Sequence, residues 1–199
     1  MTTSQPPNPL SRVSDRGVWP LEGVLLDLGG TLIDETRAFA SPDPLRPGVR
    51  ETLDSLDGRY RLGLLSNSSR TRSELAEYLD EWGISSYFRA IISSADLGLS
   101  KPDPRMFEAG WTSLGLDRLR AAMVGDHPDV DIWGAHRAGL RTVYLETIPV
   151  PARAKRIPLP EGCVTIRRFP DLPAALRRLE GTAPPPPEPP EPGPEEDNA

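Results

Sequence analysis

The sequence contains a single cysteine, Cys163, among its 199 residues. One cysteine can form neither an internal disulfide nor a cysteine-built metal site, and this usage favours a reducing cytoplasm. The chain also lacks a run of about eighteen apolar residues, and residues 1–17 lack the apolar core of a secretion signal. We therefore expect a soluble, cytoplasmic protein that does not enter a membrane.

Apolar residues are scarce at both ends of the chain. Residues 1–17 are polar and contain prolines, whereas residues 181–199 carry eight prolines, five acidic side chains and no basic ones. These five acidic residues account for most of the formal charge of −6. Such segments bury too little apolar surface to fold. We predict a disordered N-terminal extension (1–17), one folded domain (18–180) and a disordered tail (181–199). The tail would serve to keep the chain soluble or would bind a partner that recognises proline-rich segments.

The central segment alternates short apolar runs with amphipathic stretches. The runs are "GVLLDL", "YRLGLLSNSS", "AIIS", "AAMVGDHPD" and "TVYL", and strands buried on both faces have this composition. Apolar side chains recur at helical spacing over 75–82, 107–114 and 172–179. This alternation predicts an α/β fold with an open, doubly wound, mostly parallel sheet and helices on both faces.

Polar residues follow three of the predicted strands: Asp27, the pair Ser66 and Asn67, and Asp126. Ligands bind open parallel sheets outside the carboxyl ends of the strands. Taken singly, each residue is also explained as a helix cap or a turn residue. Their shared position at strand ends favours a common site.

The segments "LLDLGGTLID", "LLSNS", "GLSKPDPRMF" and "VGDHPDVDIWGAHRAGLRTVYL" resemble, in order and style, the four motifs of the haloacid dehalogenase superfamily. The resemblance covers about residues 23–145, and "VTIRRFPDLPAALRRL" is similar to the family's closing strand and helix. It implies a Rossmann-like fold. Most members are magnesium-dependent phosphatases with an aspartate nucleophile, so the resemblance implies a phosphorylated substrate and Mg²⁺ as cofactor.

The resemblance also implies a role for each matched residue. Asp27 would be the nucleophile that forms an aspartyl-phosphate. Ser66 and Asn67 would bind phosphate oxygens, and Lys101 would neutralise the nucleophile and the phosphoryl group. Asp126 would bind Mg²⁺ together with Asp27 and the backbone carbonyl of residue 29, while Asp131 would orient that site. The resemblance thus implies that Asp27 and Lys101 are the catalytic residues and that the metal site contains Asp27, Gly29 and Asp126.

Residue 29 departs from the family pattern. Phosphatases of the family usually have a second aspartate there, which protonates the leaving oxygen and then activates water, but this chain has Gly29. Glycine keeps the carbonyl and loses the general acid–base group, which contributes roughly 10²- to 10⁴-fold in rate. The protein would then be a slow phosphatase or one limited to good leaving groups, unless Asp34 or His127 carries the proton instead.

Spacing argues against a cap domain. Asp27 and Ser66 are 39 positions apart and Ser66 and Lys101 are 35 apart, and core helices occupy much of both intervals. The resemblance implies that capless members act on macromolecular substrates or close their site with a second subunit, as in a homodimer. The expected absence of a cap makes dehalogenase activity less favoured, because that reaction needs an enclosed apolar pocket.

Two further interpretations remain open. Seven basic residues cluster late in the chain and could attract nucleic acid, but the absence of a nucleic-acid motif favours a solvated surface: Arg153, Lys155, Arg156, Arg167, Arg168, Arg177 and Arg178. The rival to an enzyme is a catalytically weak or inactive binding or regulatory protein, which would act through the phosphate site or the proline-rich tail. Gly29 supports the rival, and the presence of Asp27, Lys101 and Asp126 supports the enzyme.

Overall fold

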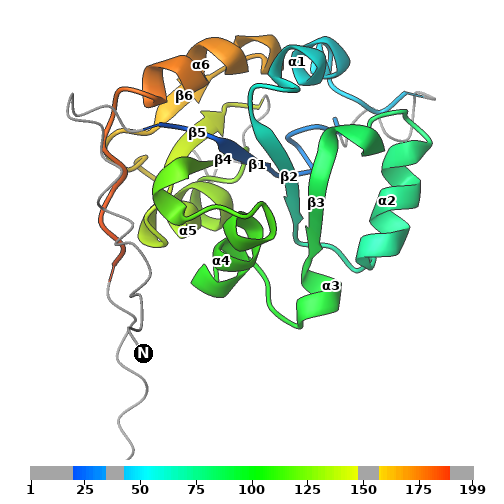
Figure 1. The fold of residues 1–199 in the computed structure, drawn as a ribbon, viewed down its shortest axis with the longest axis horizontal. Helices are drawn as coiled ribbons and strands as arrows, with labels where there is room; N and C mark the ends of the chain where they lie inside the picture. Colours follow the sequence, from blue (N-terminus) through cyan, green and yellow to red (C-terminus); the bar gives the residue numbers. More distant parts are fainter. Residues whose placement is uncertain (1–19, 35–42, 148–156, 189–199) are drawn as a thin grey trace, which may run out of the picture.

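A computed structural model of the chain describes residues 20–34, 43–147 and 157–188. A sheet of six strands forms its centre, and every neighbouring pair of these strands is parallel. The predicted α/β fold with a doubly wound sheet is confirmed (Figure 1). The strands are β1 (Gly23–Leu26), β2 (Arg61–Ser66), β3 (Phe88–Ser93), β4 (Ala121–Gly125), β5 (Arg141–Leu145) and β6 (Val164–Ile166).

The strand order is β3-β2-β1-β4-β5-β6. From β1 the chain moves outward through β2 to β3, then returns to the other side of β1 and moves outward again through β4, β5 and β6. The winding direction therefore reverses between β1 and β4. In open parallel sheets this reversal leaves a crevice at the carboxyl ends of the two central strands, where ligands bind.

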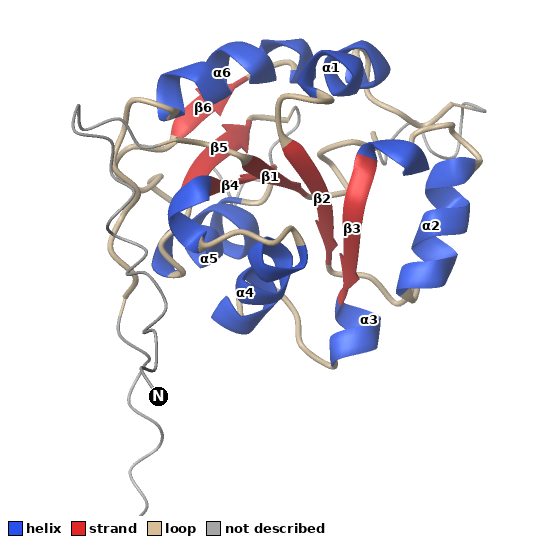
Figure 2. Cartoon of the chain, viewed as in Figure 1, coloured by secondary structure: helices blue, strands red, loops and turns tan. Residues whose placement is uncertain are grey.

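At least one helix separates each pair of consecutive strands from β1 to β5, and α6 follows β6 (Figure 2). The stretches predicted to be helical at 75–82, 107–114 and 172–179 correspond to α2, α4 and α6. The helices are α1 (Val49–Leu56), α2 (Arg72–Asp80), α3 (Ser94–Leu97), α4 (Pro104–Ser113), α5 (Gly134–Arg137) and α6 (Leu172–Leu179), with 3-10 turns η2 (Ser85–Tyr87), η3 (Arg118–Arg120) and η6 (Phe169–Asp171) and a π-helical segment η4 (Pro128–Trp133). Local signals set the helix starts: Thr71 and Glu74 form a capping box before α2, and the Asp103 side chain caps α4.

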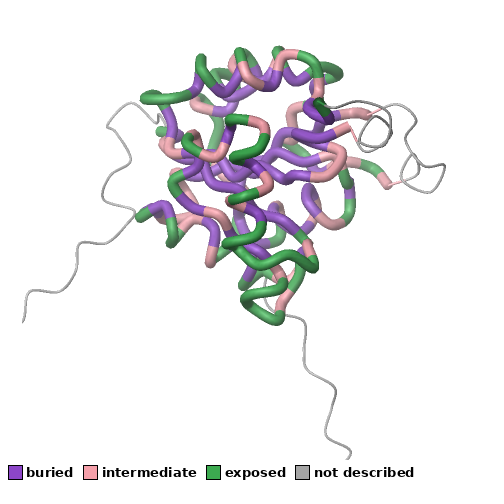
Figure 3. Tube along the Cα trace, turned by 90° about the vertical axis from the view of Figure 1, so that its right-hand side faces the viewer, coloured by how far each residue is buried: buried purple, intermediate pink, exposed green. Residues whose placement is uncertain are grey.

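The helices form one layer on each face of the sheet. Successive strand side chains point to opposite faces. Val24 and Leu26 accordingly join a buried cluster with α1, α2 and α6, whereas Leu25 joins a second cluster with α4 and α5. Figure 3 shows the buried strands enclosed between these layers. Among the described residues no element forms a cap over the sheet, as the spacing predicted.

Two glycines allow α4 to pack closely against β1. A Cβ atom at Gly110 would lie 2.7 Å from Cδ1 of Leu25, and one at Gly63 would lie 3.0 Å from its Cδ2. Because both positions lack a side chain, Leu25 fits between helix α4 and strand β2. This contact fixes the helix that follows Lys101 against the strand that precedes Asp27.

The first residues of the predicted tail, 181–188, are among the described residues and contact the domain. The backbone N–H of Glu188 donates to the carbonyl of Arg137 at 2.9 Å, and their side chains form an ion pair at 3.4 Å. The Pro185 carbonyl also accepts a hydrogen bond from Arg118 at 3.5 Å. Prolines cannot donate backbone hydrogen bonds, but their carbonyls and a flanking acid still find partners here.

Several predicted features lie outside the described residues. These are the extension 1–17, part of the segment between β1 and α1, the basic residues at 153–156 and the tail beyond residue 188. Among the described basic residues, Arg167 pairs with Glu146 and Arg168 pairs with Asp171, each at 3.0 Å on exposed surface. None of the described helices has the length and apolar content needed to span a membrane.

Candidate active site

The polar residues that follow the central strands line one pocket at the reversal point of the sheet. The pocket has a volume of about 700 Å³ and is open to solvent. Asp34, the other proton carrier considered from the sequence, is not among the residues that line this pocket. The structure brings together the remaining candidates: Asp27, Gly29, Ser66, Asn67, Lys101, Asp126, His127 and Asp131. Their placement follows from the sheet, because β1, β2 and β4 end side by side at Leu26, Ser66 and Gly125.

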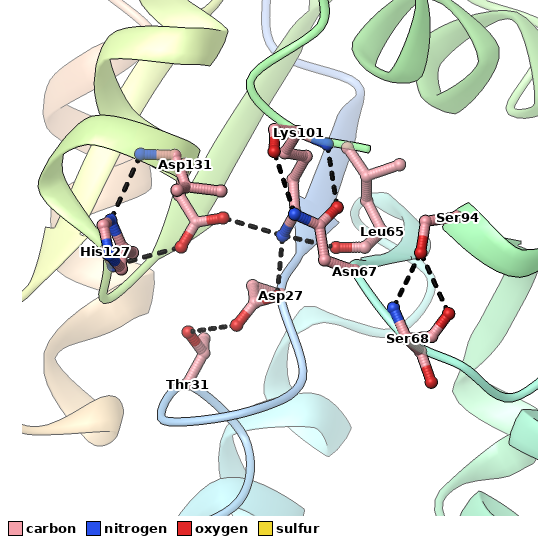
Figure 4. Close-up of polar contacts among 10 residues, drawn as sticks. Asp27, Thr31, Leu65, Asn67, Ser68, Ser94, Lys101, His127 and Asp131 are labelled. Carbon is pink, nitrogen blue, oxygen red and sulfur yellow. Dashed lines mark hydrogen bonds and ion pairs between the residues drawn. The ribbon is translucent and has the colours of Figure 1, made fainter. Parts of the chain in front are cut away.

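Lys101 lies at the floor of the pocket and contacts two carboxylates. Its Nζ donates to Oδ1 of Asp27 and to Oδ1 of Asp131, both at 2.7 Å, and to the carbonyl of Leu65 at 2.8 Å (Figure 4). The three donors of the ammonium are therefore all used. Lys101 is only 3% exposed. Burial alone would lower its pKa, but the two carboxylates outweigh burial and raise it, so the side chain stays charged.

Asp27 is held from both sides of its carboxylate. Oδ1 accepts from Lys101, and Oδ2 accepts a hydrogen bond from the buried hydroxyl of Thr31 at 3.2 Å. Burial raises the pKa of Asp27, the ammonium of Lys101 lowers it, and the nearby carboxylate of Asp131 raises it again. This contact of Thr31 was not predicted from the sequence, although Thr31 is part of the "TL" pair in the first motif.

Asn67 lines the pocket, and its side-chain amide binds the backbone of Lys101. Its side-chain oxygen accepts the Lys101 N–H at 2.8 Å, and its side-chain nitrogen donates to the Lys101 carbonyl at 2.9 Å (Figure 4). These two bonds join the end of β2 to the loop before α4. The amide therefore fixes the position of Lys101, a role that the sequence did not predict. Ser66 is buried at the end of β2 and lines the pocket.

Three carboxylates form a cluster that could hold a cation. Oxygen atoms of Asp27, Asp126 and Asp131 all lie within 4.8 Å of one another. The ammonium of Lys101 binds two of these acids, Asp27 and Asp131. Burial followed by repulsion from Asp131 raises the pKa of Asp126 to about 6, although the charge of Arg46 lowers it. A divalent cation would offset this excess of negative charge, and oxygen ligands suit Mg²⁺. The donor set therefore fits the expected metal.

Asp131 lies in the first turn of the helical segment that follows β4, and this segment, η4, is π-helical. Its Oδ2 accepts the backbone N–H of His127 at 3.1 Å, while its Oδ1 accepts from Lys101. The side chain of His127 is exposed and lines the pocket, and its Nδ1 accepts the N–H of Val130 at 3.2 Å. A neutral imidazole with that acceptor carries its proton on Nε2.

The two glycines of the first motif differ in what the backbone requires. Gly30 has φ +73°, and a Cβ there would lie 2.1 Å from a carboxylate oxygen of Asp126. Gly29 is not in the left-handed region. Conformation and close approach thus both require glycine at position 30, whereas the φ of Gly29 does not require it. The carbonyl of Gly30 accepts a hydrogen bond from Nε of Arg46 at 2.6 Å, a contact for which the sequence held no signal.

A sequence profile of haloacid dehalogenase-like hydrolases matches residues 44–145. The matched range is half of the chain. It includes Ser66, Lys101 and Asp126, and it begins after Asp27.

Two curated relatives resemble parts of the chain. A phosphoserine phosphatase of Thermus thermophilus is 39% identical over 64 residues, which are 32% of this chain and 26% of that protein. The pyrimidine 5'-nucleotidase YjjG of Escherichia coli is 31% identical over 100 residues, 50% of this chain and 44% of that protein. The chain therefore spans less than half the length of these relatives.

A solved structure resembles the chain over more of its length. It is a protein of uncharacterised function from Listeria monocytogenes serotype 4b, with 29% identity and a TM-score of 0.70. The similarity covers 81% of this chain and 100% of that one. The fold described above therefore matches that protein over its whole solved chain.

Proposed function

Because the chain belongs to the family of haloacid dehalogenase-like hydrolases, we propose that it hydrolyses phosphate monoesters through a covalent intermediate on Asp27. The observation that carries this proposal is the position of Lys101. A buried ammonium bonded to Asp27 and Asp131 at 2.7 Å places positive charge where a phosphoryl group and its nucleophile would meet. A scaffold that needed only stability would gain as much from apolar side chains there.

The proposed reaction has two displacement steps. A carboxylate oxygen of Asp27 attacks phosphorus, and the bond from phosphorus to the ester oxygen breaks, so that the leaving alcohol takes up a proton. Water then attacks the aspartyl-phosphate, releasing inorganic phosphate and restoring the carboxylate. Thr31 and Lys101 keep the Asp27 carboxylate oriented during both steps. Ser66 lies at the pocket edge of β2, where its hydroxyl would bind a phosphate oxygen.

The residues that would hold Mg²⁺ are Asp27, Asp126 and the carbonyl of Gly29. Asp131 would orient Lys101 and the turn at His127 beside them. When bound, the ion would offset the charge of the transferring phosphoryl group. The Asn67 amide would act by placing Lys101, with its remaining N–H available to a phosphate oxygen.

Gly29 determines which substrates the site can use. Without a carboxylic acid at this position, the leaving group must be stable with little protonation, as in aryl or acyl phosphates. His127 is the candidate replacement donor, since it lines the pocket and its ring is oriented by Val130. A rate for His127→Gln equal to wild type would remove it from this role.

The setting of the site bears on substrates and partners. An open pocket would admit a phosphorylated macromolecule as readily as a small phosphate ester, and a second copy of the chain could cover it. We place the protein in the cytoplasm because Cys163 is free. The proline-rich tail would be available to a partner beyond residue 188.

The test is hydrolysis of an aryl phosphate with Mg²⁺ by wild type, Asp27→Asn, Gly29→Asp and Gly29→Asn. Wild type is expected to turn over slowly, and Asp27→Asn is expected to lose at least about 10³-fold. Gly29→Asp is expected to gain roughly 10²- to 10⁴-fold if the acid is missing. Gly29→Asn is the matched control, because it adds a side chain of the same size without an acid.

Three outcomes decide between the alternatives. Wild type indistinguishable from Asp27→Asn would exclude the enzyme and leave a binding or regulatory protein. A gain in Gly29→Asp alone would establish proton transfer as the missing function. Equal rates in wild type and Gly29→Asp, both well above Asp27→Asn, would mean that another group already carries the proton.

A further inference from the structure

Trp133 connects the wall of the pocket to the start of the tail. It is the last residue of η4, the segment that carries Asp131, and its side chain is partly exposed. The indole Nε1 donates a hydrogen bond to the carbonyl of Pro158 at 2.8 Å. Pro158 directly follows Ile157, and Ile157 lines the pocket. One indole N–H thus contacts the backbone next to a pocket residue that is far away in sequence.

The other side of the indole is also held. The guanidinium of Arg137 lies over the ring, 5.7 Å from its centroid, and the His136 ring packs edge-on at 5.5 Å. Arg137 is in turn bound by Glu188 through its backbone carbonyl and its side chain. A Trp ring prefers a guanidinium over its face. The tail therefore holds Arg137 where it restrains the indole.

Ile157 occupies a distinct part of the pocket. The charged groups lie around Lys101, whereas Pro128, Val130 and Ile157 supply the apolar part of the lining. In a phosphate monoester the organic group extends away from the phosphorus and from the acids that surround it. An apolar wall there would contact that organic group and not the reacting atoms.

We propose that Trp133 is a positioning residue of this site, which holds Ile157 in the pocket wall through the carbonyl of Pro158. The kinetic part of this inference rests on the proposed function, whereas the structural part does not. Trp133 itself is not among the residues that line the pocket. Its effect reaches the substrate through the organic group.

The first test measures the anchor directly. Hydrogen–deuterium exchange of the peptide covering residues 157–166 is compared in wild type, Trp133→Phe and Trp111→Phe. Phenylalanine keeps an aromatic ring under Arg137 but removes the N–H that binds Pro158. Trp111, on α4 against the Leu25 cluster, is the matched control. Exchange is expected to be faster in Trp133→Phe alone, and equal exchange in all three proteins would overturn the proposal.

The second test separates positioning from a purely structural role. For an aryl phosphate, KM of Trp133→Phe is expected to rise about three- to tenfold, because weakening one apolar contact lowers substrate affinity by about that factor. For acetyl phosphate, whose organic group is small, KM should change less than about twofold, and kcat should be unchanged for both.

Faster exchange with an unchanged KM for the aryl phosphate would reduce Trp133 to a structural residue and overturn the proposal. A fall in kcat for both substrates would do the same, since it would place the effect at the reacting atoms. If wild type hydrolyses neither substrate, the proposed function fails by itself, and the exchange experiment still decides whether Trp133 anchors Ile157.

Discussion

The Lys101 side and the Gly29 side of the pocket are held in different ways. On the Lys101 side, side chains from separate strands and loops bind one another, with three bonds to Nζ and two to the backbone of Lys101. On the Gly29 side, positions 29 and 30 offer backbone only, in a turn held by Arg46 and packed closely against Asp126. The first side therefore places an ammonium between two carboxylates, whereas position 29 offers no side chain that could transfer a proton.

The largest effect should come from breaking the Lys101 side with Lys101→Met. Removing one partner of a buried ion pair leaves carboxylates unpaired, which costs about 3–5 kcal/mol. We expect a loss of this size in the free energy of unfolding at neutral pH without metal, measured by denaturant titration, together with loss of turnover. Arg105→Met is the control, because its ion pair with Asp103 is exposed and should contribute little. A stable Lys101→Met protein would show that the buried charges are not coupled as described.

Metal binding should have the second largest effect, because the proposed ligands come from both the Lys101 side and the Gly29 side of the pocket. At a Mg²⁺ concentration of about 100 times Kd, binding is expected to add about 2.7 kcal/mol to the free energy of unfolding. The measurement is the rise in Tm with MgCl2 at constant ionic strength. Asp126→Asn should abolish the rise. Asp129→Asn, which changes an exposed carboxylate of the same pocket, should keep it. A rise that persists in Asp126→Asn would place the ion elsewhere.

The glycine pair tests the Gly29 side alone. Gly30→Ala forces a side chain into the left-handed region, which costs about 1–2 kcal/mol. It also pushes against Asp126, so the response to Mg²⁺ should weaken. Gly29→Ala should change stability by less than about 1 kcal/mol, because its φ suits any residue. Equal losses of unfolding free energy in the two variants would contradict the different roles given to the two glycines.

The smallest effect concerns how Lys101 is placed. Asn67→Ala removes two neutral hydrogen bonds to the Lys101 backbone, which together contribute about 1–2 kcal/mol. We expect a matching loss in unfolding free energy and a fall of roughly tenfold in kcat/KM as Lys101 shifts. Ser68→Ala is the neighbouring control, since its hydroxyl accepts only a local bond from Arg70. Unchanged kinetics in Asn67→Ala would restrict the amide to a structural role.

The sequence predicted well those features that depend on neighbouring residues in the chain. Apolar runs placed the strands, and polar residues directly after those runs identified Asp27, Ser66 and Asp126 as one group. The features it missed depend on contacts between distant positions. Asn67 and Lys101 are separated by 34 positions, and Arg46 and Gly30 by 16, and no periodicity encodes which polar group such a residue will find. The π-helical geometry under Asp131 was missed for a related reason, because apolar spacing predicts a helix but not its hydrogen-bond register.

The close packing of α4 on β1 affects how natural variants of this chain should be interpreted. Gly110 lies in the middle of a helix, and a ranking of substitutions by distance from the pocket would treat it as harmless. Any side chain there would press on Leu25 and move the helix whose first turn follows Lys101. A variant at Gly110 is therefore expected to disturb the position of Lys101, although Gly110 does not line the pocket.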